Sequence, residues 1–132
     1  MTERGLLDTS VFIADESGRP LDASALPEQG FVSVVTVAEL QAGVLAAGDL
    51  ETRARRLATS EAVSALIPLS VDEVAARHGA RLRVALYEAG RRINVNDLWI
   101  AAVALAHDLP VVTQDGDFDV LDELGLVTVV RV

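Results

Sequence analysis

The chain has 132 residues, of which 51% are apolar, and its formal net charge is −9. This length favours one domain with a core of its own, and we expect residues 1–132 to form it. The absence of cysteine excludes a disulfide framework, a zinc–thiolate site and a cysteine nucleophile, and the absence of lysine excludes every mechanism that needs that side chain.

Short apolar runs alternate with segments of helical periodicity along the chain. The apolar runs predict strands over residues 5–8, 31–34, 66–69, 110–113 and 126–130. The periodic segments predict helices over residues 35–47, 50–65, 71–89, 97–107 and 118–124, with a loop from Glu16 to Gly30. Ser70 and Glu73 have the spacing of a capping box for the third of these helices. Strands that alternate with helices predict a three-layer α/β fold, in which helices cover both faces of a mostly parallel central sheet.

The N-terminus and the apolar runs indicate the location of the protein, and its net charge indicates what it can bind. The N-terminus, Met1-Thr2-Glu3-Arg4, lacks the basic start and long apolar stretch of a secretory signal, and no apolar run is long enough for a membrane span. We therefore expect a cytoplasmic protein with no membrane partner. A charge of −9 argues against broad electrostatic binding of nucleic acid. It is, however, typical of a protein that gathers carboxylates around divalent cations.

Acidic residues stand where the predicted strands end and the predicted helices begin. Asp8 ends the first strand, Glu39 lies one turn into the helix after the second, and Asp97 opens a helix. Asp115 and Asp117 follow the strand that ends at Thr113. Ligands of open parallel sheets bind beyond the carboxyl ends of the strands, so these acids are expected to converge there.

A cluster of carboxylates suits divalent-metal chemistry on phosphates. Mg²⁺ and Mn²⁺ prefer oxygen ligands, and bound ions can stabilise the attacking and leaving oxygens of a phosphoryl displacement. Asp8 and Asp97 carry the strongest signal, because each lies in an apolar run where an unpaired carboxylate is unfavourable.

Each acid also has a structural interpretation. Asp8 could cap the following turn, and Asp97 could complement a helix dipole. Thr36 and Glu39 match a capping box. Asp115-Gly116-Asp117 could be a solvated turn.

Taken in order, the acidic motifs resemble those of PIN-domain nucleases, and most closely the VapC-type toxins of bacterial toxin–antitoxin pairs. The resemblance covers nearly the whole chain and is carried by four segments. These are Leu6-Leu7-Asp8-Thr9-Ser10-Val11, Thr36-Val37-Ala38-Glu39-Leu40, Asn96-Asp97-Leu98-Trp99-Ile100-Ala101-Ala102 and Val112-Thr113-Gln114-Asp115-Gly116-Asp117-Phe118.

The resemblance implies a metal-dependent endoribonuclease with Mg²⁺ or Mn²⁺ as cofactor, RNA as substrate, a cognate antitoxin as partner, and a homodimer. It implies that Asp8, Glu39 and Asp97 are the principal catalytic and metal-binding acids. Asp115 matches the fourth acid and Asp117 an auxiliary or alternative fourth, and the two stay unresolved because the family often has Asn in place of Asp115. The hydroxyls that would support the acids are those of Thr9, Ser10 and Thr113.

Other readings of the sequence are weaker. A haloacid-dehalogenase phosphatase needs a second Asp where Ser10 stands, and both it and a response-regulator receiver need the absent lysine. An EF-hand starting at Asp115 lacks its Gly, where Val120 stands, and its final Glu, where Leu126 stands. Two alternatives within the family remain: a catalytically silent PIN-like module that binds a protein, and a housekeeping nuclease that is no toxin.

Two surfaces are expected to serve partners. Arg91 and Arg92 precede Asp97 closely in sequence and are candidates for RNA binding, because guanidinium groups suit phosphate recognition. The predicted helix over residues 50–65 is an extra helix, which a minimal alternation of strands and helices does not need. We therefore expect it to build an antitoxin groove or a dimer surface.

Overall fold

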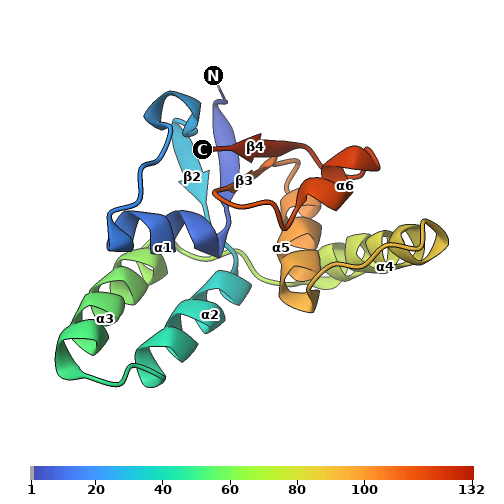
Figure 1. Cartoon of the computed structure of the whole chain (residues 1–132). Helices are drawn as coiled ribbons and strands as arrows, with labels where there is room; N and C mark the ends of the chain where they lie inside the picture. Colours follow the sequence, from blue (N-terminus) through green and yellow to red (C-terminus); the bar gives the residue numbers. More distant parts are fainter. Residues whose placement is uncertain (1) are drawn as a thin grey trace.

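A computed structural model describes residues 2–132 and contains four strands and six α-helices around one parallel sheet (Figure 1). The strands are β1 (Arg4–Leu7), β2 (Gln29–Phe31), β3 (Val111–Thr113) and β4 (Val129–Arg131). The helices are α1 (Thr9–Ser17), α2 (Val34–Leu45), α3 (Leu50–Ser64), α4 (Glu73–Glu88), α5 (Val95–Ala106) and α6 (Asp119–Glu123), with a 3₁₀ turn, η1 (Ala23–Ala25).

The sheet has the strand order β2-β1-β3-β4, and all its pairings are parallel. The chain passes from β1 to β2 through α1, and from β3 to β4 through α6, so the two connections run in opposite directions from the centre of the sheet (Figure 1). The strand order therefore reverses between β1 and β3. A crevice beyond the carboxyl ends of the strands is expected at that point.

Side chains that alternate along the strands fill two different cores. Leu6 and Val111 point into the core that α4, α5 and α6 cover. Their neighbours Leu7 and Val112 point to the opposite face, where Val11 of α1 covers them. Because strand side chains alternate with a period of two, helices pack on both faces. The predicted three-layer α/β fold is confirmed.

The helix α5 forms the centre of the larger core. Ile100, Ala101, Ala102, Val103 and Ala104 are fully buried. A helix that is apolar on all sides is stable only when protein surrounds it, and α4 packs along α5 on the side away from the sheet (Figure 1).

No helix was predicted at α1, where Val11, Phe12 and Ile13 form an apolar run after Asp8. The helix starts at Thr9 because Asp8 is its N-cap and accepts a bond from the backbone N–H of Ser10.

The predicted strand over residues 66–69 was wrong. Leu69 forms only an isolated bridge to Ser33. Ile67 has a φ of 55°, which is a left-handed conformation, and Pro68 has no N–H to donate, so the strand cannot extend towards Leu66.

Several boundaries also differ from the predictions, and β2 (Gln29–Phe31) shares only Phe31 with the strand predicted over residues 31–34. Val34 belongs to α2 and not to a strand, because Ser33 caps the helix. The capping box of Ser70 and Glu73 was wrong, since Asp72 is the N-cap of α4 and accepts from the N–H of Ala75 at 3.0 Å. The last strand starts at Val129 and not at Leu126, because α6 ends in a left-handed Gly125 and the N–H of Leu126 returns to the carbonyl of Leu121.

Within residues 2–132, no helix is both long enough and apolar enough to cross a membrane. The cytoplasmic location stays a prediction.

The packing of α4 on α5 predicts the effect of one substitution. A Cβ atom on Gly79 would lie 2.5 Å from Cζ3 of the Trp99 ring. Gly79→Ala should therefore destabilise the protein by roughly 1–3 kcal/mol of overpacking, which exceeds the gain of about 1 kcal/mol in helix propensity. Urea unfolding would measure the change.

Gly43→Ala is the matched control, because Gly43 also lies in a helix and its added Cβ would meet only Cδ of Arg56, at 3.9 Å. We expect this variant to be neutral or more stable. Equal stability of the two variants would contradict the steric explanation.

Candidate active site

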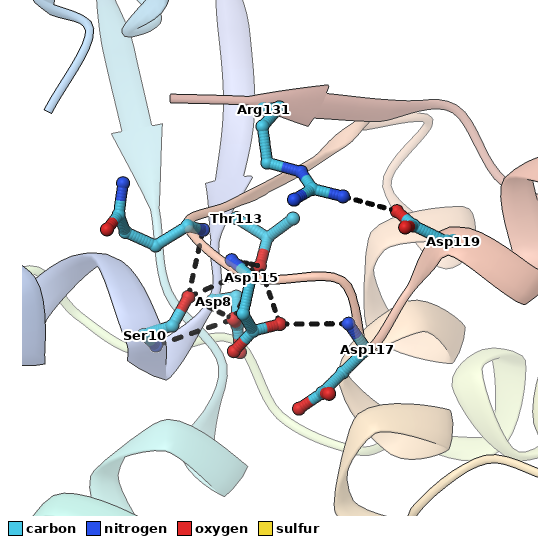
Figure 2. A network of polar contacts seen from close by, with 8 residues as sticks. Asp8, Ser10, Thr113, Asp115, Asp117, Asp119 and Arg131 are labelled. Atoms are coloured by element: carbon cyan, nitrogen blue, oxygen red, sulfur yellow. Dashed lines mark hydrogen bonds and ion pairs between the residues drawn. The ribbon is translucent and has the colours of Figure 1, made fainter.

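The candidate site lies where β1 and β3 end side by side (Figure 2). Asp8 follows β1 directly, and its backbone N–H donates to the carbonyl of Val112 at 2.9 Å. Thr113 is the last residue of β3, and Asp115 and Asp117 lie in the loop between β3 and α6. The reversal of the strand order therefore brings the first and last acidic motifs together.

Asp8 is held through one of its two carboxylate oxygens. Its Oδ2 accepts from Ser10 Oγ at 2.6 Å and from Thr113 Oγ1 at 2.9 Å (Figure 2). Each hydroxyl has a single proton, so both protons are used on the same oxygen. Among the described residues, Oδ1 of Asp8 has no hydrogen-bond partner. The carboxylate, 3% exposed, is thus oriented with one oxygen left for a ligand.

Gln114 fixes the position of the loop after β3, a role the sequence did not reveal. Its backbone N–H donates to Ser10 Oγ at 3.0 Å, and its side-chain Nε2 donates to the carbonyl of Val132 at 2.5 Å. Gln114 therefore connects the loop after β3 to Val132 and, through Ser10, to Asp8.

Glu39 comes from α2 and accepts from a different hydroxyl, that of Thr9. Thr9 Oγ1 donates to Glu39 Oε1 at 2.7 Å, and it lies 2.9 Å from Thr36 Oγ1. Since Thr9 gives its only proton to Glu39, Thr36 must donate to Thr9. The capping-box interpretation of Glu39 is wrong, because Ser33 and not Thr36 is the N-cap of α2. The sequence predicted only that capping role for Thr36 and did not reveal its contact with Thr9.

Asp97 lies in the first turn of α5 and is 9% exposed. Within residues 2–132, its carboxylate has no hydrogen bond or ion pair. Burial, followed by the charges of Asp8, Asp117, Glu39 and Asp115 in decreasing order, raises the pKa of Asp97 to about 7. The positive end of the helix dipole favours a carboxylate at this position, but it does not offset burial among four other acids.

Asp115 acts electrostatically on both Asp8 and Asp97, whereas Asp117 acts on Asp97. Asp115 is half-buried and contributes to the raised pKa of Asp8, although burial is the main cause of that rise. Asp117 is exposed and contributes more than Asp115 to the raised pKa of Asp97. The turn expected here also forms, since the N–H of Asp117 donates to Asp115 Oδ1 at 3.0 Å. The segment Asp115-Gly116-Asp117 thus forms a turn and also contributes acids to the cluster.

Arg131 does not neutralise these acids. Its guanidinium donates to Asp119 at 2.6 Å, on the other side of the loop (Figure 2). The cluster therefore has no bound cationic side chain among the described residues.

The donor set fits a divalent cation, although the side chains are not already arranged around one point. Among residues 2–132, no group of three or more acidic or histidine side chains is placed so that it could hold a metal ion. Asp8 and Glu39 are turned towards hydroxyls, and Asp97 has no partner. Oxygen donors alone favour Mg²⁺ or Mn²⁺ over a soft metal, and a divalent cation would relieve the mutual repulsion of the carboxylates.

The two predicted RNA-binding arginines do not join the acids. Arg91 pairs with Glu123 at 3.2 Å, and both Arg91 and Arg92 line a separate pocket that contains none of the five acids.

A family model described as PIN domain matches residues 5–124. The chain is 56% identical over 128 residues to ribonuclease VapC5 of Mycobacterium tuberculosis, which covers 97% of this chain and 95% of the relative. It is 42% identical over 127 residues to ribonuclease VapC4 of the same organism, which covers 96% and 97%.

Solved structures resemble the fold over the same span. A chain of VapBC-5, a member of the VapBC family of toxin–antitoxin systems from Mycobacterium tuberculosis, matches with a TM-score of 0.90, 53% identity and 98% coverage of both chains. A chain of FitAcB from Neisseria gonorrhoeae matches with a TM-score of 0.72, 31% identity and 94% coverage of both.

The raised pKa of Asp97 predicts how stability depends on pH without metal. The folded protein binds this proton more tightly than the unfolded chain, whose Asp titrates near 3.8. The free energy of unfolding should therefore fall as pH rises from 3.8 to about 7, and then level off. Denaturation in EDTA across this range would measure the slope.

Asp97→Asn removes the titrating group and should give a shallower slope and higher stability at pH 8 than the unmodified chain. Asp122→Asn, at an exposed acid of α6, is the control and should keep the original slope. If the slope survives Asp97→Asn unchanged, Asp97 is not the buried acid that titrates.

Proposed function

The chain belongs to the PIN-domain family, and we propose that it is an endoribonuclease that acts as the toxin of a toxin–antitoxin pair. The relatives named ribonuclease VapC5 and VapC4 and the neighbouring VapBC structure support this function. One observation carries the assignment to this chain: Asp97 is only 9% exposed, and burial together with the charges of four other carboxylates raises its pKa to about 7. Protein binding alone does not require this unfavourable arrangement of carboxylates. The observation therefore disfavours the alternative of a catalytically silent module that binds a protein.

We propose that Mg²⁺ or Mn²⁺ is held by Asp8, Glu39 and Asp97, with Asp115 and Asp117 completing the set. Such a cation supplies Lewis-acid stabilisation of the charge that develops on the phosphate during hydrolysis.

The residues around the acids prepare them for this role. Ser10 and Thr113 hold Oδ2 of Asp8 and leave Oδ1 free. Thr9 fixes Glu39, and Thr36 fixes Thr9. Because these partners set the orientation of the carboxylates, they reduce the ordering needed when a ligand binds.

The partner of this toxin is proposed to be an antitoxin that docks along α1 and α3. A groove between these helices is lined by Phe12, Ala58, Ala62 and Leu66. Next to it, Ile67 is 84% exposed and has a φ of 55°. An exposed β-branched residue in this strained conformation favours a contact surface. The homodimer stays a prediction.

Loss of a principal acid should abolish RNA cleavage. Asp8→Asn and Asp97→Asn should each reduce Mn²⁺-dependent cleavage of single-stranded RNA by at least about 100-fold, because loss of a residue that merely orients a ligand already costs about 10- to 100-fold. Cleavage assays with and without EDTA, and calorimetric titration with Mn²⁺, would measure both effects. Asp122→Asn should behave like the unmodified chain; full activity of both site variants would refute the assignment.

Loss of the hydroxyl that orients Asp8 should have a smaller effect. Thr113→Val keeps the side-chain shape but removes a donor to Asp8 Oδ2, and it should lower Mn²⁺ affinity and activity by about 10- to 100-fold. Thr59→Val on α3 is the control, since its hydroxyl contacts only the carbonyl of Arg55. Equal Mn²⁺ affinity of the two variants would show that Thr113 only fills space.

The docking surface can be mapped by hydrogen exchange in the complex with the antitoxin. Amides of α3 (Leu50–Ser64) and of the turn through Ile67 should exchange more slowly when the partner is bound. An unchanged rate throughout α3 would place the antitoxin elsewhere.

A further inference from the structure

A pocket of about 510 Å³ lies between the end of α4 and the start of α5. Three arginines line it, Arg83, Arg91 and Arg92, together with Tyr87. Its lining residues include no acidic side chain, in a chain whose net charge is −9. The pocket is thus a local concentration of positive charge on an acidic protein.

The arginines differ in what they already contact. Arg91 pairs with Glu123 at 3.2 Å. Within residues 2–132, Arg83 and Arg92 take part in no ion pair. Their guanidinium groups can therefore donate to a bound anion, and paired N–H donors in one plane match a phosphate.

Tyr87 gives the pocket a second kind of chemistry. It is the single tyrosine of the chain, and it is 86% exposed. The apolar side chains of Leu86, Ile93 and Leu98 also line the pocket. An exposed aromatic ring beside arginines is suited to stack on a base while the cations contact the backbone of a single strand.

The pocket is also close to the proposed catalytic acids. Val95 and Leu98, which line it, flank Asp97 in the first turn of α5. A helix is only about 10 Å across with its side chains, so a short single strand can pass from Asp97 around the start of α5 into the pocket.

We propose that this pocket binds a nucleotide next to the cleaved bond, with its base stacked on Tyr87 and its phosphate bound by Arg83 and Arg92. This inference rests on the proposed ribonuclease function and deepens it, because it makes Tyr87 a specificity-determining residue. A second copy of the chain fits the pocket less well, since a symmetric contact would bring the arginines of both copies together.

The test compares three pocket variants with one control. Tyr87→Ala, Tyr87→Phe and Arg92→Ala are assayed with Mn²⁺ on a pool of random single-stranded RNA, whose cut sites are sequenced, and on oligouridine and oligoadenosine. Binding of the same oligonucleotides is measured in EDTA at several salt concentrations. Arg81→Ala is the control, because Arg81 is an exposed arginine of the same helix that does not line this pocket.

Tyr87→Ala should raise KM about tenfold with a smaller change in kcat, and it should alter the distribution of cut sites. Tyr87→Phe keeps the ring and should keep the cut sites. Arg92→Ala should weaken binding of both oligonucleotides alike and make it less sensitive to salt. Arg81→Ala should change none of these quantities.

Two results would overturn the pocket assignment while the ribonuclease function stands. One is cleavage by Tyr87→Ala and Arg92→Ala with unchanged KM and unchanged cut sites. The other is loss of self-association or of antitoxin binding in these variants with RNA kinetics intact, which would assign the pocket to a protein partner. If the unmodified chain cleaves no RNA, the proposed function fails, and equal binding of RNA in EDTA by all variants would then refute the pocket independently.

Discussion

Carboxylates gathered away from water repel one another, and the burial of each one disfavours its charged form. This constraint organises the site, because Asp97 is 9% exposed and has four other acids within electrostatic range. The fold tolerates the arrangement by giving Asp8 two hydroxyl donors and Glu39 one. Asp97 has no such donor among the described residues, and its raised pKa favours the protonated form. This mutual repulsion is the physical reason for the proposal that the cluster binds a divalent cation.

The rest of the structure keeps the acids in place despite that repulsion. β1 and β3 are hydrogen-bonded neighbours, so the residues that follow them cannot separate without breaking the sheet. α5 is anchored by a fully apolar segment, Ile100–Ala104, which fixes its first turn and with it Asp97. The stability of these packed elements thus offsets the mutual repulsion of the acids.

The distribution of arginines supports the proposal that this acidic protein binds RNA. The acids require a cation before a phosphate can approach them, whereas the pocket of Arg83, Arg92 and Tyr87 presents positive charge without one. The two surfaces lie on either side of the start of α5. Metal and arginines are therefore proposed to contact different phosphates of one strand, so that the cation serves the reaction and the pocket selects the sequence.

The sequence by itself determined the fold class, most helices and the positions of the acids, because periodicity and strand-end motifs are local features of the chain. Only the tertiary structure decided that α1 exists, that residues 66–69 form no strand, and that Asp8 keeps Oδ1 free. It alone joined Tyr87 to Arg92 in one pocket, and Gln114 to the end of the chain. The reason is that such contacts depend on distant partners: Thr113 and Asp8 are 105 positions apart, and no local pattern records that the hydroxyl of Thr113 donates to the carboxylate of Asp8.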